Sequence, residues 1–480
     1  MKTSKLKTFP RSCLRGTAIL LLALFTLAAL LWLYQDLESG ETKLNLDRSQ
    51  SFVLTNVNVL TMNDQQVLLD QAIVVRDGVI TELSPMTQVT ADDLSIIDGK
   101  QAYVMPGLID AHVHVLDRSY AKSALAAGVT TVRNMGGFPY HLKWRKELES
   151  GEWFGSRMVV SSPIFNSIEQ GDPLAHFRVN DPELARQAVR DYIAEGYDFI
   201  KVYEGLHAQT YSAILAEANT LGVMVAGHPS YDLMHKNLAE HGALRTFEHS
   251  EEIYDGFLAQ TFDDSKAETA AQFFVDHDVA LVPTLAVNRE LTRLSNEKYA
   301  YLQQTDQAAI TPFARFIYEQ TSFKRWLNAS PELAAYNLEV DAYLHHLTQL
   351  MHERGVTLVL GSDAGALTGL PGPATIDEIE LMVAAGIAPH AALAAATVNA
   401  AHSVDMDQQL GRVAVGFQAD LIVLNDNPLS KVETLRDPMM VIQQGRAFDR
   451  ADLNQLRAEA HQHSSWLLSV ARHLNYLLFG

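Results

Sequence analysis

Short apolar runs rich in Val and Ile alternate along most of the chain with longer segments of helical spacing. Eight of these runs are typical of buried strands, at residues 104–114, 129–134, 157–161, 199–203, 224–228, 245–249, 280–285 and 357–363. Helix signals fall between them, for example an N-cap at Asp181 followed by Pro182. Eight strand–helix repeats predict a (β/α)8, or TIM, barrel over residues 104–410. A doubly wound α/β sheet is the alternative, which the count of eight disfavours.

Two further strand-rich segments flank the predicted barrel. Residues 52–103 and 411–448 are rich in Val, Ile and turn residues. They predict a small β-sandwich domain that is assembled from both sides of the barrel. Residues 35–51 are polar and predict a linker, and residues 449–480 predict a C-terminal amphipathic helix.

The connection between the seventh and eighth predicted strands is too long for a bare loop. Residues 289–350 combine charged residues, Tyr and Leu at helical spacing, so they predict a helical insertion near the barrel mouth. Such an insertion would act as a lid or an interface, or would be a passive surface elaboration.

The N-terminal segment has the pattern of a membrane anchor. Residues 17–34 form a charge-free, largely apolar run of 18 residues behind a basic segment, residues 1–16. As a helix this run would span about 27 Å, close to the thickness of a bilayer core. The preceding positive charges predict that the rest of the chain is exported, to the periplasmic side of the inner membrane in a bacterium. A cleaved signal peptide is the alternative.

Charge and cysteine content exclude some classes of function. The net charge is −20, and residues 1–35 hold five positive charges and no acidic residue, so the rest of the chain is more acidic still. We therefore expect no nucleic-acid partner. Cys13 is the only cysteine, which excludes an intramolecular disulfide. An oligomer is left open.

Candidate metal ligands end five of the predicted strands. His112 and His114 are two residues apart, so both side chains point to the same side of the first strand. The C-terminal ends of later strands carry Lys201, His228, His249 and Asp363. Because a barrel brings these ends to one mouth, the set predicts a site for zinc or a similar divalent cation.

The order H-x-H, Lys, His, His, Asp resembles the binuclear-metal branch of the amidohydrolase superfamily. The phrases MPGLIDAHVH, GVTTVRNMGG, LGSDAG and GRVAVGFQADLIVL are similar to those of its imidazolonepropionase-related and Xaa-Pro dipeptidase-like members. The resemblance covers about residues 52–448 and implies an enzyme with two divalent metal ions.

The resemblance also implies a role for each matching residue. His112, His114 and Asp363 would bind one metal, and His228 and His249 the other. Lys201, carbamylated by carbon dioxide, would bridge both metals together with a hydroxide.

The same resemblance makes Asp363 the group that moves a proton from the nucleophile to the leaving amine. Many relatives carry a histidine near the helix that follows strand eight, and the segment GLPGPATIDEIEL has none. Tyr231 and His141 are instead candidates for binding a substrate carboxylate, although a structural contact is the simpler interpretation of each.

The predicted function is hydrolysis of an amide or peptide-like C–N bond by a metal-bridged hydroxide, in a small substrate such as a dipeptide or an N-acyl amino acid. A lactonase or other ester hydrolase on the same site is an alternative. A catalytically inactive, membrane-tethered binding protein is another alternative. Such a protein is expected to have lost at least one metal-ligating residue, and all six candidate ligands are present here. A mononuclear deaminase or imidazolonepropionase would not need Lys201.

Overall fold

The computed structural model describes residue 44 and residues 49–89, 93–233 and 243–479. The chain divides into two compact units, residues 41–463 and residues 1–40 with 464–480. The described part of the first unit carries three sheets and the barrel helices. In the second unit, the described part holds helix α17 (Trp466–Phe479).

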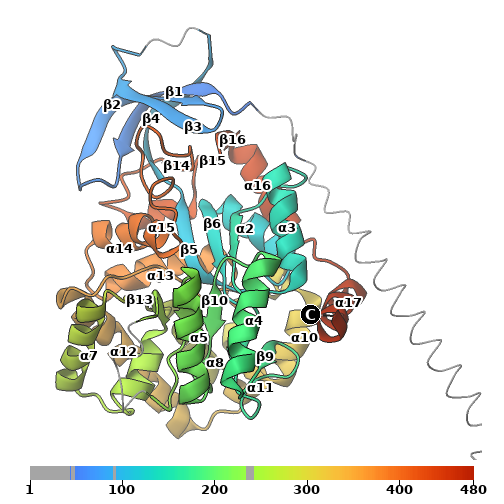
Figure 1. Ribbon diagram of the computed structural model, residues 1–480. Helices are drawn as coiled ribbons and strands as arrows, with labels where there is room; N and C mark the ends of the chain where they lie inside the picture. Colours follow the sequence, from blue (N-terminus) through green and yellow to red (C-terminus); the bar gives the residue numbers. More distant parts are fainter. Residues whose placement is uncertain (1–43, 45–48, 90–92, 234–242, 480) are drawn as a thin grey trace, which may run out of the picture. The chain divides into compact units, whose positions relative to one another are not determined.

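Residues from both sides of the barrel form one sheet of seven strands (Figure 1). Its order is β16 (Arg446–Phe448), β15 (Met440–Gln443), β14 (Leu421–Leu424), β4 (Ser95–Pro106), β1 (Phe52–Leu60), β2 (Val67–Arg76) and β3 (Val79–Pro85). Only the β1–β4 pair is parallel.

The seven strands form a single curled sheet, whereas the sequence predicts a sandwich of two packed sheets. A bridge joins Val79 of β3 to Gln418, just before β14, and the amide of Ile80 donates to the carbonyl of Phe417 at 2.8 Å. The curled sheet surrounds its own apolar core, which includes Leu54, Ile73, Val104, Leu421 and Ile442. One strongly bent sheet therefore buries a core that the sequence pattern alone attributes to two packed sheets.

The second sheet system is consistent with a TIM barrel. Its strands are β5 (Leu108–Val113), β6 (Val129–Asn134), β7 (Arg157–Val160), β10 (Ile200–Val202), β11 (Val225–Gly227), β12 (Thr246–Glu248) and β13 (Ala280–Val282). Neighbours in the two groups β5–β7 and β10–β13 pair in parallel. Two short strands, β8 (Ile164–Asn166) and β9 (His176–Arg178), extend the sheet beside β10.

Backbone hydrogen bonds close the barrel where no regular strand pairing is assigned. The amide of Ser162 donates to the carbonyl of Phe199 at 2.8 Å, which connects the end of β7 to β10. The eighth predicted strand, 357–363, is an extended segment. The amide of Val359 donates to the Leu281 carbonyl and the amide of Ala111 donates to the Leu360 carbonyl, both at 2.9 Å. This segment therefore lies between β13 and β5.

The first predicted barrel strand is divided at Gly107. Residues before this glycine belong to β4 of the seven-stranded sheet and residues after it to β5 of the barrel. A Cβ atom at position 107 would lie 2.3 Å from Oγ1 of Thr130. Only glycine allows this close approach, so the chain leaves one sheet and enters the other here without a break in its apolar pattern.

Helices cover the outside of the barrel. They are α2 (Arg118–Ala126), α3 (Pro139–Ser150), α4 (Pro182–Glu195), α5 (Ala208–Leu221), α6 (Ser250–Glu252) with the π-helix η2 (Ile253–Phe257), α7 (Asp264–His277), α13 (Pro373–Ala384), α14 (Pro389–Ala395) and α15 (Val398–Ser403). The N-cap predicted for α4 is present, since the carboxylate of Asp181 accepts from the amide of Glu183 at 2.8 Å. The 3-10 helix η4 (Val432–Arg436) packs against α13.

The stretch between β13 and the eighth segment is helical. It contains α8 (Leu285–Glu297), α9 (Tyr299–Leu302), η3 (Gln307–Ala309), α10 (Pro312–Gln320), α11 (Ser322–Leu327) and α12 (Pro331–Glu353). The hydroxyl of Tyr318 donates to the carbonyl of Gly365, and the carboxylate of Glu290 accepts from the amide of Thr368 at 2.9 Å. These helices therefore hold the loop that follows Asp363.

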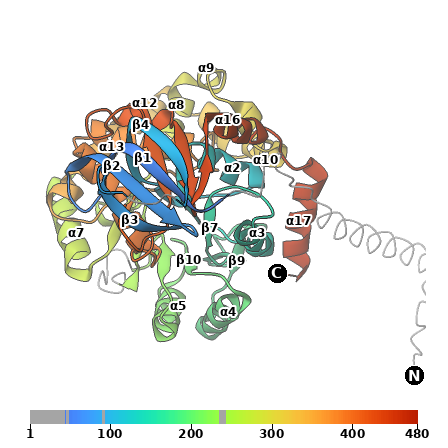
Figure 2. The same cartoon turned by 90° about the horizontal axis from the view of Figure 1, so that it is seen from above.

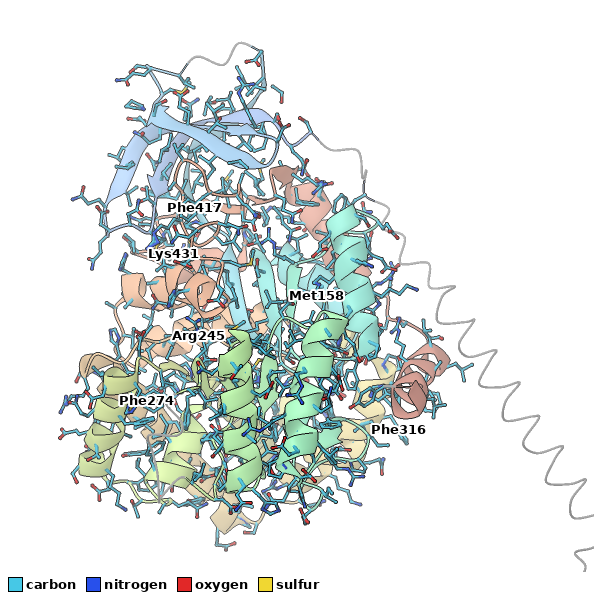
Figure 3. All side chains as sticks on the ribbon, in the orientation of Figure 1. Met158, Arg245, Phe274, Phe316, Phe417 and Lys431 are labelled. Carbon is cyan, nitrogen blue, oxygen red and sulfur yellow. The ribbon has the colours of Figure 1, made fainter. Side chains whose placement is uncertain are left out.

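The figures place these helices at the far end of the barrel. In Figure 1, α10 and α11 lie away from the seven-stranded sheet. Figure 2 shows the same structure from above, with β1 to β4 in front. In Figure 3, Met158 and Arg245, near the starts of β7 and β12, lie closer to that sheet than Phe316 of α10. The carboxyl ends of the barrel strands thus face the helical stretch.

Two helices, and not the single one predicted, lie within the described residues 449–479. Helix α16 (Arg450–Glu459) packs against α2 and buries Leu453 and Leu456. The polar residues 461–465 interrupt the pattern, because they offer no apolar side chain to continue the stripe. Ser465 then accepts from the amide of Leu468 at 3.3 Å and starts α17.

The predicted membrane anchor, and the exported location inferred from it, are corrected. Within the described part of the chain, no helix combines the length and the apolar character that a bilayer crossing requires. Even α12, with 23 residues, places Glu339 and Asp341 in its middle. The segment 17–34, on which the prediction depended, lies outside the described residues.

Candidate metal centre

The predicted ligands meet at the carboxyl ends of the barrel strands. His112 lies in β5 and His114 directly after it, Lys201 lies in β10, and His228 and His249 directly follow β11 and β12. Asp363 ends the eighth segment, where its amide donates to the carbonyl of His112 at 2.8 Å. All six positions therefore belong to one end of the barrel.

Distances between side chains define a first group of ligands. Oδ1 of Asp363 lies 3.0 Å from Nε2 of His114 and 3.4 Å from Nε2 of His112. These three side chains can present their ligand atoms to one cation. Imidazole nitrogens and a carboxylate oxygen are ligands that zinc prefers.

The remaining histidines continue this cluster. The ring centroids of His112 and His249 are 4.7 Å apart, and those of His249 and His228 are 4.6 Å apart. The Nζ atom of Lys201 lies 5.4 Å from the ring of Tyr203, which stacks on His228 at 4.0 Å. The structure thus brings Lys201 and all four histidines together.

The Nδ1 atoms of two of these histidines are held by neighbouring side chains. Nδ1 of His112 lies 2.7 Å from Oε2 of Glu248. Nδ1 of His249 lies 2.7 Å from the hydroxyl of Thr284. The rings are therefore oriented with Nε2 left for another partner, which is the usual arrangement of a metal-binding histidine.

Two carboxylates lie close to Nδ1 of His228. Oε2 of Glu204 and Oε1 of Glu252 lie 2.9 Å and 3.0 Å from its Nδ1. Burial opposes a charge on this ring, but the carboxylates of Glu252 and Glu204 raise its pKa to about 9. The two carboxylates therefore favour the protonated ring, and a cation bound at Nε2 would compete with a proton for this site.

Buried polar atoms in the cluster fit a divalent cation. Within the described part of the chain, Nζ of Lys201 and Nε2 of His228 are buried and form no hydrogen bond. Burial lowers the pKa of Lys201 to about 8, and burial with the charge of Lys201 lowers the pKa of His112 well below its ordinary value. A buried group without a partner is costly, and bound cations with an anionic bridge would remove that cost.

The backbone is strained at three residues of the cluster. His249, Thr284 and Asp363 have φ angles of 71°, 51° and 55°. Residues other than glycine seldom adopt such angles, and those that do gather at functional sites.

The two candidate substrate contacts have different surroundings. His141 is buried, its Nε2 lies 2.8 Å from the carbonyl of Val115, and its Nδ1 accepts from the amide of Phe138 at 3.0 Å. These contacts are structural, and a role in substrate binding stays a prediction. Tyr231 is 42% exposed, and its amide donates to the carbonyl of Glu204, so it lies beside the cluster.

Sequence reasoning missed the polar residues that support the ligands. Arg133 of β6 and Glu248 of β12 are fully buried and connect to His112. Asp110 of β5 accepts from the hydroxyls of Ser362 and Thr375, both at 2.6 Å. Each is a charged residue inside an apolar strand run, and that mismatch is the signal that could have found them.

A model of the amidohydrolase family matches residues 103–446, which is more than half of the chain. The chain belongs to the amidohydrolase family. It is therefore a hydrolase that acts on C–N bonds, and the predicted resemblance to this family is confirmed.

Individual relatives agree with this assignment. The imidazolonepropionase of Shewanella sp. (strain ANA-3) is 26% identical over 404 residues, which cover 77% of this chain and 91% of the relative. A solved structure from Bifidobacterium longum, assigned as a prolidase, is 27% identical with a TM-score of 0.68, covering 86% of this chain and 99% of the other. Bottromycin amidohydrolase, 24% identical with a TM-score of 0.73 over 90% and 96% of the two chains, shares the fold.

In this amidohydrolase, the substitution Gly227→Ala tests whether the backbone before His228 determines the position of its side chain. A Cβ atom at Gly227, whose φ is +146°, would lie 2.1 Å from the carbonyl oxygen of Val202, which also accepts from the amide of His228. We expect Gly227→Ala to destabilise the fold by about 1–3 kcal/mol through strain and to weaken metal binding about tenfold or more. Thermal unfolding and competition with a chelator measure the two effects.

Gly222 offers the matched control. Its φ is +68°, and no described atom lies within 4 Å of a Cβ placed there. Gly222→Ala should cost about 1–2 kcal/mol and leave metal affinity unchanged. Equal metal affinity in both variants would show that Gly227 does not position His228.

Proposed function

We propose that this amidohydrolase holds two divalent metal ions, zinc or similar, and hydrolyses the amide bond of a dipeptide or N-acyl amino acid. The observation that carries the proposal is the buried, unpaired amine of Lys201 in a cluster with four histidines and Asp363. Six ligand side chains are too many for one tetrahedral ion. When bound, the metals would lower the pKa of a water molecule and polarise the scissile carbonyl.

The chain's own residues divide into two ligand sets. His112, His114 and Asp363 would hold one ion, and His228 and His249 the other. Lys201 lies among both sets, and its cationic form would repel two dications. Its pKa of about 8 leaves a fraction of neutral amine near neutral pH, which can take up carbon dioxide as a carbamate and release a proton. The resulting carbamate anion would be a ligand for both metal ions.

Asp363 is the residue placed to move a proton. Its side chain is 13% exposed, and its Oδ1 lies 3.4 Å from Nε2 of His112 and 3.0 Å from Nε2 of His114. A carboxylate in this position can accept the proton of the nucleophile and transfer it to the leaving amine. Leaving-group protonation is what makes C–N cleavage possible at neutral pH.

Relatives support the substrate class. The Bifidobacterium longum protein is assigned as a prolidase, which favours a dipeptide with a C-terminal proline as a first substrate to test. The curated relatives that match are imidazolonepropionases, which makes the reaction of that enzyme the second candidate. Lys201 favours the first, because a mononuclear reaction does not need it. Hydrolysis of a lactone at the same site is the third candidate reaction.

The experiment combines metal removal with a substrate series. Purified protein would be stripped by a chelator, reloaded with zinc, and assayed on Xaa-Pro dipeptides, N-acyl amino acids, γ-lactones and imidazolone propionate. We expect activity to disappear on stripping and to return with zinc, with an amide substrate preferred over a lactone. Full activity in protein shown by elemental analysis to contain no metal would contradict the proposal.

A further inference from the structure

A buried polar relay lies behind His112. Oε2 of Glu248 contacts Nδ1 of His112 at 2.7 Å, and Oε1 of Glu248 accepts from Nη2 of Arg133 at 2.8 Å. The side chains of Glu248 and Arg133 are fully buried, and that of His112 is 2% exposed. Three strands, β5, β6 and β12, thus supply one continuous chain of hydrogen bonds.

The contacts of Arg133 fix the direction of the carboxylate. Its Nε donates to the carbonyl of Ala111 at 2.5 Å, and its Nη1 donates to the hydroxyl of Thr246 at 2.9 Å. That hydroxyl in turn donates to Oε1 of Glu248. Oε1 therefore has two donors already, and Oε2 is left to face His112.

This arrangement determines which ring nitrogen of His112 carries a proton. A carboxylate accepts hydrogen bonds and donates none, and the carboxylate of Glu248, 2.7 Å from Nδ1, is nearer than that of Asp363, 3.4 Å from Nε2. A neutral His112 therefore places its proton on Nδ1, toward Glu248. Nε2 then has a free lone pair and points toward Asp363. His249 differs, since its Nδ1 faces the neutral hydroxyl of Thr284, which can donate or accept.

We propose that Glu248, held by Arg133, is a positioning residue that fixes the proton and orientation of His112 for metal binding. The inference rests on the proposed binuclear function. If the Arg133–Glu248 ion pair only stabilised the fold, Oε2 of Glu248 would not have to contact the ring of His112, which is a proposed metal ligand. Partners of this kind typically change metal affinity by about 10–100-fold.

The test separates positioning from folding by removing the charges singly and together. Glu248→Leu leaves Arg133 as an uncompensated buried cation and should lower the melting temperature of the metal-free protein. The double variant Arg133→Met with Glu248→Leu removes both charges and should recover most of that stability. Zinc affinity, measured by competition with a chelator, should stay about 10–100-fold weaker in the double variant.

A second buried ion pair gives a matched control. Nζ of Lys122 contacts Oε2 of Glu459 at 2.7 Å, between α2 and α16, with side chains 9% and 4% exposed. Glu459→Leu, alone and with Lys122→Met, should lower and restore stability in the same way. Zinc affinity should equal that of the unchanged protein in both of these variants.

The outcomes decide between the alternatives. Zinc affinity that returns together with stability in the Arg133→Met, Glu248→Leu double variant would overturn the positioning role. If Glu248→Leu does not fold, the double variant still gives the answer. Failure of the unchanged protein to bind zinc would instead refute the proposed function, which distinguishes the two failures.

Discussion

Asp363→Asn is expected to lower kcat by about 10²–10⁴-fold while leaving most of the metal bound. An asparagine oxygen can still ligate a cation, but it cannot accept a proton at neutral pH. KM should change little, because binding of the substrate carbonyl in the ground state does not need the carboxylate. Steady-state kinetics and elemental analysis of the same preparation measure the two effects.

His228→Ala is the comparison that gives this result its meaning. His228 has no proton to deliver to the substrate in this account, so its loss should remove metal and activity together. An Asp363→Asn protein with full metal and more than about a tenth of the unchanged kcat would show that Asp363 is only a ligand and that the proton moves elsewhere.

Lys201→Ala is the second large effect. In the proposed site, removing the amine would take away the anionic bridge, so the metal assigned to His228 and His249 should be lost. Because a metal contributes several kcal/mol of charge stabilisation, kcat should fall by more than about 100-fold. Lys201→Arg keeps a positive charge but cannot form a carbamate, and it should be as inactive as the alanine variant.

Small carboxylic acids provide a rescue experiment for this variant. Formate or acetate can enter the space left by the Lys201 side chain and supply an anion between the two ligand sets. We expect partial recovery of activity and of metal content in Lys201→Ala with excess zinc, and none in Lys201→Arg, where the guanidinium fills the space. Equal activity of Lys201→Arg and the unchanged protein would show that Lys201 acts as a simple cation.

Much of the site could be predicted because each ligand ends an apolar strand run. His112, Lys201, His228 and His249 are polar residues at the same depth of the first, fourth, fifth and sixth strands, and barrel geometry then requires them to meet. The structure places them together as expected. Their roles as ligands stay predictions until a metal is measured.

Other features depend on contacts between residues far apart in sequence. The curl of the seven-stranded sheet rests on the pairing of Val79 with Gln418, which no local pattern contains. The division of the first strand at Gly107 is hidden because apolar residues continue across it. The Arg133–Glu248 pair joins strands more than a hundred residues apart, so its charge balance is visible only in three dimensions.

The metal content of the unchanged protein tests the central claim most directly. Protein purified with zinc in the medium, freed of loosely bound ions and analysed for elements, should contain two equivalents of metal per chain. Lys201→Ala prepared in parallel should contain one or fewer. One tightly bound equivalent in the unchanged protein, with the same content in Lys201→Ala, would contradict the binuclear site.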